Sequence, residues 1–472
     1  MSIFLLIASF VLLICITSSK ILYRFGIPTL LIFLVIGMLF GSDGIARIYF
    51  DNMELAKEIS SIGLVIILFY GGFNTNIKAA KPAVILAILL STVGVVITAG
   101  VTGLFCHYIL KIGFLESFLV GAVVSSTDAA SVFSILRSQK LNLKGSLASI
   151  LEIESGSNDP FAYMITILVL SLMGSGSDHS MVHLLFTQLF FGITVPIALS
   201  FIAIKLMRKI EFEIEGFYPI FFAAIALLSF SGAELLGGNG YLSVYLFGII
   251  VGNSKIPHKK STAKFFDGIC WLIHIAMFFL LGLLSFPSKF VDVMAPGLLV
   301  ALFLLVVARP VAVFLLLSFF KMDLKEKLFI SWGGLRGAAS IVFAMIAVTS
   351  GINLQHDIFH TIFFICLVSV ALQGTLLPYV AKKLNLVDDN MPVLKTFNDY
   401  ASEKNNQLLE VTVDEDSKWC NKTIMDANIP EEILIVMIKR NDEVIVPKGN
   451  TKIQIGDILV LSGNHIETLI AV

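Results

Sequence analysis

The chain is a succession of long apolar runs separated by short polar loops, and this pattern restricts it to a membrane-spanning helical fold. Of its 472 residues, 57% are hydrophobic and 14% are charged, which is more apolar than soluble domains of this size. A helix needs about 20 apolar residues to cross a bilayer. We therefore expect an all-α polytopic membrane protein of about thirteen spans. They lie near residues 2–18, 28–46, 59–77, 82–106, 113–136, 146–172, 184–204, 217–235, 240–253, 268–287, 296–320, 328–349 and 357–380.

The basic residues of the loops predict the orientation of these spans. Lysine and arginine concentrate after the odd-numbered spans, whereas the loops after the even-numbered spans hold only Arg47, Lys57, Lys111 and Lys289. Loops rich in lysine and arginine stay on the cytoplasmic side of a membrane. The alternation therefore predicts an N-terminus outside and a C-terminus in the cytoplasm.

Polar groups inside three of the spans mark a candidate transport path. These groups are Glu154-Ser-Gly-Ser-Asn158-Asp159-Pro160 in the sixth span, Thr127-Asp128 in the fifth and Arg336 in the twelfth. A charge at the bilayer centre costs about 2.5–3.5 kcal/mol on insertion scales, so such groups face a protein interior or an aqueous cavity. The combination favours a carrier of cations and protons over a scaffold.

The fifth and twelfth spans contain similar short sequences. Asp128-Ala-Ala-Ser131-Val-Phe lies seven spans before Arg336-Gly-Ala-Ala-Ser340-Ile-Val-Phe, and an odd offset reverses direction in the membrane. This predicts an inverted repeat of spans 1–6 and 8–13 with the binding site near the midplane. Chance similarity of small-residue strings is the alternative. Glycine and hydroxyl residues beside each charge predict helices that unwind there.

Asp159 is the predicted carrier of the cation and the proton, because exchange needs one carboxylate that can hold either. Burial favours the protonated form of a carboxylate and makes this competition effective. Ser155 lies one helical turn earlier on the same face and offers a neutral oxygen ligand. The amide of Asn158 cannot titrate, which predicts one proton per cation.

Glu154 lies about 100° around the helix from Ser155, so it faces a different partner. We expect a structural ion pair between Glu154 and Arg336. Structural alternatives exist for the other acids, because Asp159 could cap or kink a helix and Asp128 could be the N-cap of a half-helix. For Asp128, capping and ion binding are compatible.

Other polar residues of the spans are interpreted as structural. Arg309 precedes a proline, and His274 lies inside an apolar span, where a hydrogen-bonded packing role is expected. Glu152 and Glu234 lie near predicted span ends and are interpreted as interfacial.

Composition changes beyond residue 383. Residues 1–383 form the predicted transmembrane domain, residues 384–406 a polar linker, and residues 407–472 a small α+β cytoplasmic domain of short β segments with turn signals. No glycine-rich nucleotide-binding half precedes this domain, so nicotinamide and other cofactors are not expected. A small-ligand sensor and a dimerisation module are both compatible with its size.

Other functional classes lack their signatures. A potassium channel needs a filter like Thr-Val-Gly-Tyr-Gly, which is absent from the sequence. An enzyme needs a catalytic constellation, and the sequence contains no His-Glu-x-x-His, nucleophile elbow or P-loop. The chain is therefore not expected to be an enzyme, and nothing indicates a nucleic-acid partner. A ligand-gated channel or a sensor remains a remote alternative.

Three motifs carry a family resemblance. Ser125-Ser-Thr-Asp128-Ala-Ala-Ser-Val-Phe, Glu154-Ser-Gly-Ser-Asn-Asp159-Pro and Gly333-Gly-Leu-Arg336-Gly-Ala resemble the bacterial NhaP-type branch of the monovalent cation:proton antiporters. The resemblance implies a bacterial cytoplasmic-membrane protein with the thirteen-helix antiporter fold, crossed broken helices, a homodimer and elevator-like alternating access. It also implies potassium/proton exchange, with sodium/proton exchange as the alternative.

The resemblance also implies roles for individual residues. It places Asp128, Asp159, Asn158, Thr127 and Ser155 at the ion and proton site, with the cation on Asp128 and Asp159, and makes Glu154 and Arg336 the supporting pair. The Asn158-Asp159 sequence resembles the electroneutral branch.

Two further regions bear on this resemblance. Many relatives carry an acid before the Gly-Gly of the third span, where this chain has Tyr70, so a phenol replaces a carboxylate near the expected cytoplasmic funnel for ions. Val446-Pro-Lys-Gly449-Asn-Thr451 and Gly456-Asp457 resemble the TrkA-C module, the C-terminal lobe of domains that regulate potassium conductance. This implies a small regulatory ligand such as a cyclic dinucleotide.

Overall fold

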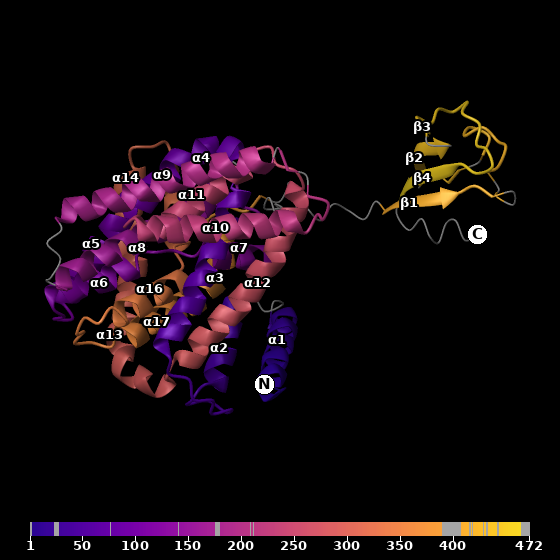
Figure 1. Ribbon diagram of the computed structural model, residues 1–472. Coiled ribbons are helices and arrows are strands. Elements are labelled where there is room, and N and C mark those ends of the chain that lie inside the picture. The colour runs from indigo at the N-terminus through magenta and orange to yellow at the C-terminus, as the bar shows by residue number, and fades with distance from the viewer. Residues whose placement is uncertain are drawn as a thin grey trace. The chain divides into compact units, whose positions relative to one another are not determined.

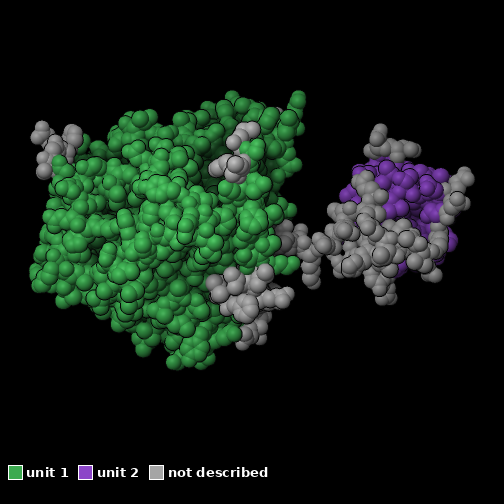
Figure 2. Space-filling model, turned by 90° about the horizontal axis from the view of Figure 1, so that it is seen from below, with its two compact units in different colours: residues 1–398 green, residues 399–472 purple. Residues whose placement is uncertain are grey.

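The computed structural model divides into two compact units, residues 1–398 and residues 399–472 (Figure 2). The first unit is a bundle of helices and the second contains a β-sheet (Figure 1). The structure describes residues 2–22, 28–75, 77–139, 141–174, 180–207, 209–210, 212–388, 407–414, 417, 419–427, 429–430, 433–440 and 443–463.

The helices of the first unit match the predicted spans in order. The first six spans are α1 (Ser2–Leu22), α2 (Thr29–Phe40), α3 (Met53–Asn74), α4 (Ile77–Leu89) with η2 (Leu90–Gly94) and α5 (Val95–Tyr108), α6 (Phe114–Val123) with α7 (Ala129–Ser138), and α8 (Leu147–Met173). The next four are α9 (Met181–Met207), α10 (Phe217–Leu235), α11 (Gly240–Gly252) and α12 (Lys259–Leu284). The last three are η3 (Pro287–Lys289) with α13 (Phe290–Phe303), η4 (Leu304–Ala308) and α14 (Arg309–Leu317), α15 (Leu324–Trp332) with α16 (Ala338–Val348), and α17 (Ile358–Val368) with η5 (Ser369–Gly374) and α18 (Thr375–Lys383).

Several of these helical segments have the length that a bilayer requires, whereas others are shorter. By length and apolar composition, 7 helical segments within the described residues can cross a membrane, and shorter apolar helices accompany them. The 27-residue α8 is also long enough, but it carries the acids of the sixth span. The fifth and twelfth spans are each divided into two short helices, as the glycine and hydroxyl residues beside their charges predicted.

Irregular turns recur at the offset of the inverted repeat. The π turn η2 interrupts the fourth span and the π turn η4 interrupts the eleventh. The breaks between α6 and α7 and between α15 and α16 follow in the fifth and twelfth spans. These two π turns and the two breaks therefore lie seven spans apart, as the sequence similarity predicted, whereas the π turn η5 of the thirteenth span has no counterpart in α8 of the sixth. Such turns commonly mark functional sites.

Close glycine contacts fix α3 against α11. A Cβ on Gly72 would overlap the Tyr245 carbonyl oxygen, and a Cβ on Gly248 would overlap the Phe69 carbonyl oxygen. At the same ends of these helices, Asn253 Nδ2 donates a hydrogen bond of 2.8 Å to the Thr75 carbonyl oxygen. Glycine is needed here because the two backbones touch. The end of α3 is thereby held beside the end of α11, a few residues before α12 begins.

The chain beyond α18 stays against the helical unit as far as the structure describes it. Val387 forms a β-bridge with Leu143, and the Lys144 N–H donates to the Leu386 carbonyl oxygen at 2.9 Å. Most of the predicted linker lies outside the described residues, so its extent stays a prediction.

The second unit is an antiparallel sheet with strand order β1-β4-β2-β3. The strands are β1 (Gln407–Thr412), β2 (Ile433–Arg440), β3 (Glu443–Ile445) and β4 (Ile458–Gly463). Alternate residues such as Ile438, Leu459 and Leu461 are buried in one hydrophobic cluster. The predicted β segments are confirmed, and residues 407–463 hold no helix where the structure describes them.

Candidate ion-binding site

The break in the fifth span exposes Asp128 at the start of a half-helix. Residues 124–128 separate α6 from α7, and Asp128 immediately precedes α7. Asp128 Oδ1 accepts a hydrogen bond of 3.2 Å from the Ser131 N–H, and Oδ2 accepts one of 2.7 Å from the Ser131 hydroxyl. These are N-cap contacts, so the predicted capping role of Asp128 is confirmed.

The break in the twelfth span crosses the first. Residues 333–337 separate α15 from α16, and the Asp128 N–H donates a hydrogen bond of 2.7 Å to the Leu335 carbonyl oxygen. A Cβ on Gly337 would overlap the Asp128 carboxylate. Only glycine therefore allows the second break to approach Asp128 this closely.

Arg336 joins the two breaks through the backbone. Its Nη1 donates hydrogen bonds of 2.8 Å to the carbonyl oxygens of Ser125 and Ser126, and its own N–H donates to the Ser369 hydroxyl at 3.0 Å. These carbonyls lie where the helix is interrupted and need donors within the protein. Arg336 is 2% exposed, so its charge is used inside the protein.

The predicted ion pair between Glu154 and Arg336 is wrong. Glu154 instead pairs with Arg309, with Nη1 to Oε1 at 2.5 Å and Nη2 to Oε2 at 2.8 Å. Both side chains are buried. The physical reason is that the broken span engages Arg336 through its carbonyls, which leaves Arg309, at the start of α14, to face the acid. The helical phase of Glu154 indicated a separate partner but could not identify it.

The polar face of α8 packs against the break in the fifth span. Ser126 donates a hydrogen bond from its hydroxyl to Asp159 Oδ1. Asn158 donates through Nδ2 to the Thr127 hydroxyl at 2.5 Å and accepts from the Thr127 N–H at 3.4 Å. The acid and the amide are therefore both tied to the break.

Ser155 bridges the ends of the same break. Its hydroxyl donates to the Thr127 carbonyl oxygen at 2.7 Å and accepts from the Ala129 N–H at 2.8 Å. It therefore replaces contacts that an unbroken helix would make by itself. Its position one turn before Asp159 is the predicted one.

A cavity of about 230 Å³ brings most of the predicted site together. Asp128, Asp159, Thr127 and Ser155 line it. Within the described part of the chain, Asn158, Glu154 and Arg336 are not among its lining residues. Asn158 instead holds Thr127 in place, whereas Glu154 and Arg336 serve the structure around the site.

Sequence reasoning missed part of the cavity wall. Asp267, His274 and Glu152 also line the cavity, and Tyr70 donates a hydrogen bond of 3.1 Å from its hydroxyl to Asp267 Oδ1. The predicted tenth span began at residue 268, whereas α12 begins at Lys259, because the basic residues at its start were assigned to a loop. The helical spacing of Asp267 and His274 could have placed both on one face.

The predicted packing role of His274 is confirmed in part. Its Nδ1 lies 2.7 Å from the Cys270 carbonyl oxygen one turn earlier, so the ring is hydrogen-bonded within α12. The same ring nevertheless lines the cavity. Glu152 was interpreted as interfacial but lies on the cavity wall as well.

Comparisons with known proteins agree with this architecture. The family of sodium/hydrogen exchanger transmembrane domains matches residues 7–383, and the TrkA-C domain matches residues 408–466. The chain therefore belongs to the sodium/hydrogen exchanger family. The predicted resemblance and the predicted class of fold are confirmed.

Relatives with assigned functions match most of the chain. The K(+)/H(+) antiporter NhaP of Alkalimonas amylolytica is 37% identical over 95% of this chain and 79% of its own length. The K(+)/H(+) antiporter NhaP2 of Shewanella baltica is 34% identical over 98% of this chain and 81% of its own length. The Na(+)/H(+) antiporter 1 of Methanocaldococcus jannaschii is 30% identical over 71% of this chain and 80% of its own length.

A solved structure shares the fold. The sodium proton antiporter MjNhaP1 from Methanocaldococcus jannaschii matches with a TM-score of 0.71 and 26% sequence identity. The match covers 81% of this chain and 99% of that chain. The helical unit therefore has the fold of this antiporter.

Proposed function

We propose that the protein exchanges a monovalent cation, with potassium preferred, for protons across a bacterial cytoplasmic membrane. The observation that carries this proposal is that two carboxylates from different elements, Asp128 and Asp159, face one cavity at a crossing of broken helices. Ionisable groups in such a position are typical of ion and proton pathways.

In this proposal Asp159 is the residue that binds either the cation or the proton. Its carboxylate accepts a hydrogen bond from Ser126 and faces the cavity. Ionised Asp159 binds the cation with Asp128 and the oxygens of Thr127 and Ser155, which suit a hard cation. Protonation of Asp159 removes its charge and releases the cation. Asp159 cannot hold the cation and the proton at the same time, so the movement of the cation is coupled to the movement of the proton.

Electroneutral exchange is proposed because the residue beside Asp159 is Asn158, an amide and not a second carboxylate. Asn158 holds Thr127 through its amide and has no proton to exchange. One carboxylate that alternates between a cation and a proton moves one positive charge in each direction. We therefore propose one proton per cation, with Asp128 capping α7 throughout.

Potassium is preferred on the basis of the relatives. The two bacterial relatives named as K(+)/H(+) antiporters match 95% and 98% of this chain, whereas the relative named as a Na(+)/H(+) antiporter matches 71%. A sodium/proton antiporter with the same mechanism is the alternative.

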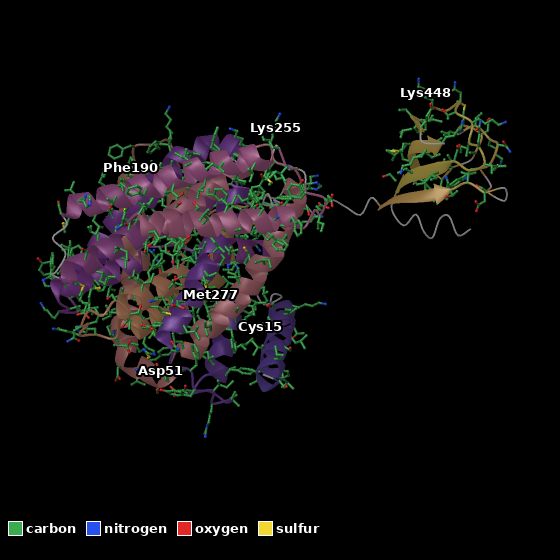
Figure 3. All side chains as sticks on the ribbon, in the orientation of Figure 1. Cys15, Asp51, Phe190, Lys255, Met277 and Lys448 are labelled. Carbon is green, nitrogen blue, oxygen red and sulfur yellow. The ribbon has the colours of Figure 1, made fainter. Side chains whose placement is uncertain are left out.

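We also propose elevator-like movement in a homodimer, with the N-terminus outside and the C-terminus in the cytoplasm. The long helix α9 is the candidate surface for a partner or lipid. Only 22% of its apolar 18-residue segment is buried, and Phe190 lies exposed at the surface of the unit (Figure 3). Met277, by contrast, is buried and lines the cavity. Cross-linking of cysteine pairs introduced along α9 tests the dimer, and monomeric behaviour in the membrane would overturn it.

For the second unit we propose a regulatory role with a small ligand, for which a cyclic dinucleotide is the first candidate. The support is the TrkA-C match over residues 408–466. Exchange by the full chain is expected to change on addition of a cyclic dinucleotide. If calorimetry detects no binding and the exchange rate is unaltered, the domain has another ligand or serves dimerisation.

The decisive test is exchange by the purified full chain in proteoliposomes with a pH-sensitive dye. We expect potassium to dissipate an imposed pH gradient, with little effect of an imposed membrane voltage. Asp292→Asn is a matched control, because Asp292 is exposed at the start of α13 and lies outside the residues that line the cavity. A response to sodium alone would transfer the proposal to sodium/proton exchange, and no response to either cation would overturn it.

A further inference from the structure

The cavity has a second polar region, formed by α3 and α12. The lining residues of α12 include Asp267, Trp271 and His274, whose spacing places them on one face of the helix. Asp267 is half-buried, and its Oδ1 accepts the hydrogen bond of 3.1 Å from the Tyr70 hydroxyl. An acid that is absent from the ion-binding motifs is therefore part of the same cavity.

Tyr70 is built to hold Asp267 in place. Its side chain is 8% exposed, and its ring lies stacked on Phe266, with centroids 6.5 Å apart and planes at 29°. A ring that is fixed by packing presents its hydroxyl in one direction. The carboxylate of Asp267 is therefore held at the wall, where an incoming cation can reach it.

Asp267 lies toward one end of the helical unit. It follows the first residue of α12 by about two turns, and Tyr70 precedes the last residue of α3 by about one turn. The hydrogen bond between Asn253 and Thr75 holds the end of α3 beside the end of α11, a few residues before α12 begins. Basic residues follow α3 and begin α12, so this is the end that the loop charges predict to be cytoplasmic. Asp159 lies more than three turns from the start of α8, deeper in the unit.

We propose that Asp267, positioned by Tyr70, captures the monovalent cation at the cytoplasmic end of the cavity and passes it to Asp128 and Asp159. This inference rests on the proposed antiport. An acid in a cleft with apolar walls concentrates cations at its mouth and speeds their entry. Because this proposal gives Asp267 the capture of the cation and leaves the proton to Asp159, Asp267 sets the cation concentration needed for half-maximal exchange and not the maximal rate.

Glu152 is the rival for this role, because it also lines the cavity and lies near the start of α8. The proposal commits to Asp267, because its carboxylate accepts a hydrogen bond from the hydroxyl of the buried Tyr70. Glu152→Gln therefore serves as the comparison variant. A role for Glu152 and not for Asp267 would overturn the inference.

The test measures exchange against potassium concentration in everted membrane vesicles, in which the cytoplasmic face is outside. Asp267→Asn is expected to raise the half-saturating potassium concentration about tenfold, with the maximal rate changed by less than about twofold, since one nearby charge is lost. Tyr70→Phe keeps the packed ring and is expected to raise this concentration about threefold. Asp267→Glu keeps the negative charge and is expected to have the half-saturating concentration of the unmodified protein. Asp292→Asn, the exposed control on α13, should leave both quantities unchanged.

A second measurement separates electrostatic capture from a structural role. Added choline chloride screens exposed charges. It is expected to raise the half-saturating potassium concentration of the unmodified protein and to have a smaller effect on Asp267→Asn. If Asp267→Asn fails to accumulate, Tyr70→Phe carries the test, because it removes a hydroxyl and leaves the ring in place.

The outcomes distinguish this inference from the proposed function. An unmodified protein that exchanges potassium for protons, with an unaltered half-saturating concentration in Asp267→Asn and Tyr70→Phe, would overturn the inference alone. An equal loss of maximal rate in both variants would also overturn it, because capture does not limit that rate. Absence of exchange in the unmodified protein would instead overturn the antiport on which the inference rests.

Discussion

The crossing of the two broken spans has an open side and a closed side. On the open side, Asp128 and Asp159 line a cavity of about 230 Å³. On the closed side, Arg309 and Arg336 line a hollow of about 10 Å³, which is close to the space of a single water. Both sides carry buried charge, but only the open side has room for an ion. The available space, and not charge alone, separates the candidate ion site from the buried charges that support it.

The contacts of the charged groups differ in the same way. Arg309 is matched by the Glu154 carboxylate, and Arg336 is matched by two carbonyl oxygens of the broken fifth span. On the open side, Asp159 accepts from a neutral hydroxyl, and its carboxylate remains on the cavity wall. Charges on the closed side therefore hold the break together, whereas those on the open side face a cavity.

The largest effect should come from removing Asp159, the proposed carrier on the open side. Asp159→Asn is expected to abolish potassium/proton exchange, because the amide cannot take up a proton in place of the cation. The protein should still be folded, since the amide fits the same space beside Ser126. Exchange in proteoliposomes and size-exclusion profiles check the two expectations. Retained exchange would show that another group carries the proton.

On the closed side, removal of one partner should destabilise the protein. Glu154→Ala leaves Arg309 buried without its carboxylate, and breaking a buried pair costs about 3–5 kcal/mol. We expect a lower yield and a lower temperature of unfolding in detergent. Asp292→Asn is the control, since this acid is exposed.

A double-mutant cycle distinguishes the observed pair from the one that the sequence suggested. Strong coupling is expected between Glu154→Ala and Arg309→Met, because these side chains touch. Weak coupling is expected between Glu154→Ala and Arg336→Met, since Arg336 binds carbonyl oxygens. The opposite order of coupling would contradict the assignment of the closed side.

The boundary between the two sides can be tested at Gly337. Gly337→Ala places a Cβ against the Asp128 carboxylate, and overpacking of this kind costs about 1–3 kcal/mol. We expect exchange to fall about 30-fold at a given potassium concentration, because Asp128 is displaced. Gly100→Ala in α5 is the matched control, since its added Cβ would meet no described atom within 4 Å beyond its chain neighbours and its own helix backbone. Equal behaviour of the two variants would show that the crossing is looser than the structure indicates.

The sequence predicts much of the fold because membrane helices leave strong signals. Apolar length and loop charge locate the spans, and glycines beside a charge locate the breaks. The partners of buried side chains leave no such signal, because they depend on how helices rotate against one another. The sequence therefore predicts an ion pair of Glu154 with Arg336, whereas the structure pairs Glu154 with Arg309. The sequence does not indicate Asp267, because the basic residues at the start of α12 resemble a loop and the predicted span therefore begins after this acid.

The second unit extends the comparison to an ion pair outside the membrane. Arg440 donates through Nε to Asp457 Oδ1 at 2.7 Å and through Nη2 to Oδ2 at 2.7 Å. The Arg440 side chain is 25% exposed, whereas Asp457 is buried. Burial raises the pKa of Asp457, but hydrogen bonds from Arg440 and from the Gln454 N–H outweigh it, so its pKa lies below the ordinary 3.8.

This pair should have the smallest effect of those compared, because water screens it. Arg440→Gln is expected to reduce the stability of the second unit by about 1 kcal/mol at neutral pH. A carboxylate with a lowered pKa stabilises the folded state above its unfolded pKa and loses that contribution as the pH falls through its folded value. The difference between the two proteins should therefore shrink below about pH 4.

Urea unfolding followed by Trp419 fluorescence measures this difference in the full chain. Trp271→Phe and Trp332→Phe remove the other two of the 3 tryptophans in both proteins. A difference that persists unchanged at low pH would mean that Arg440 acts through packing of its alkyl chain and not through its charge. A difference that disappears would show that water and acid can weaken this pair.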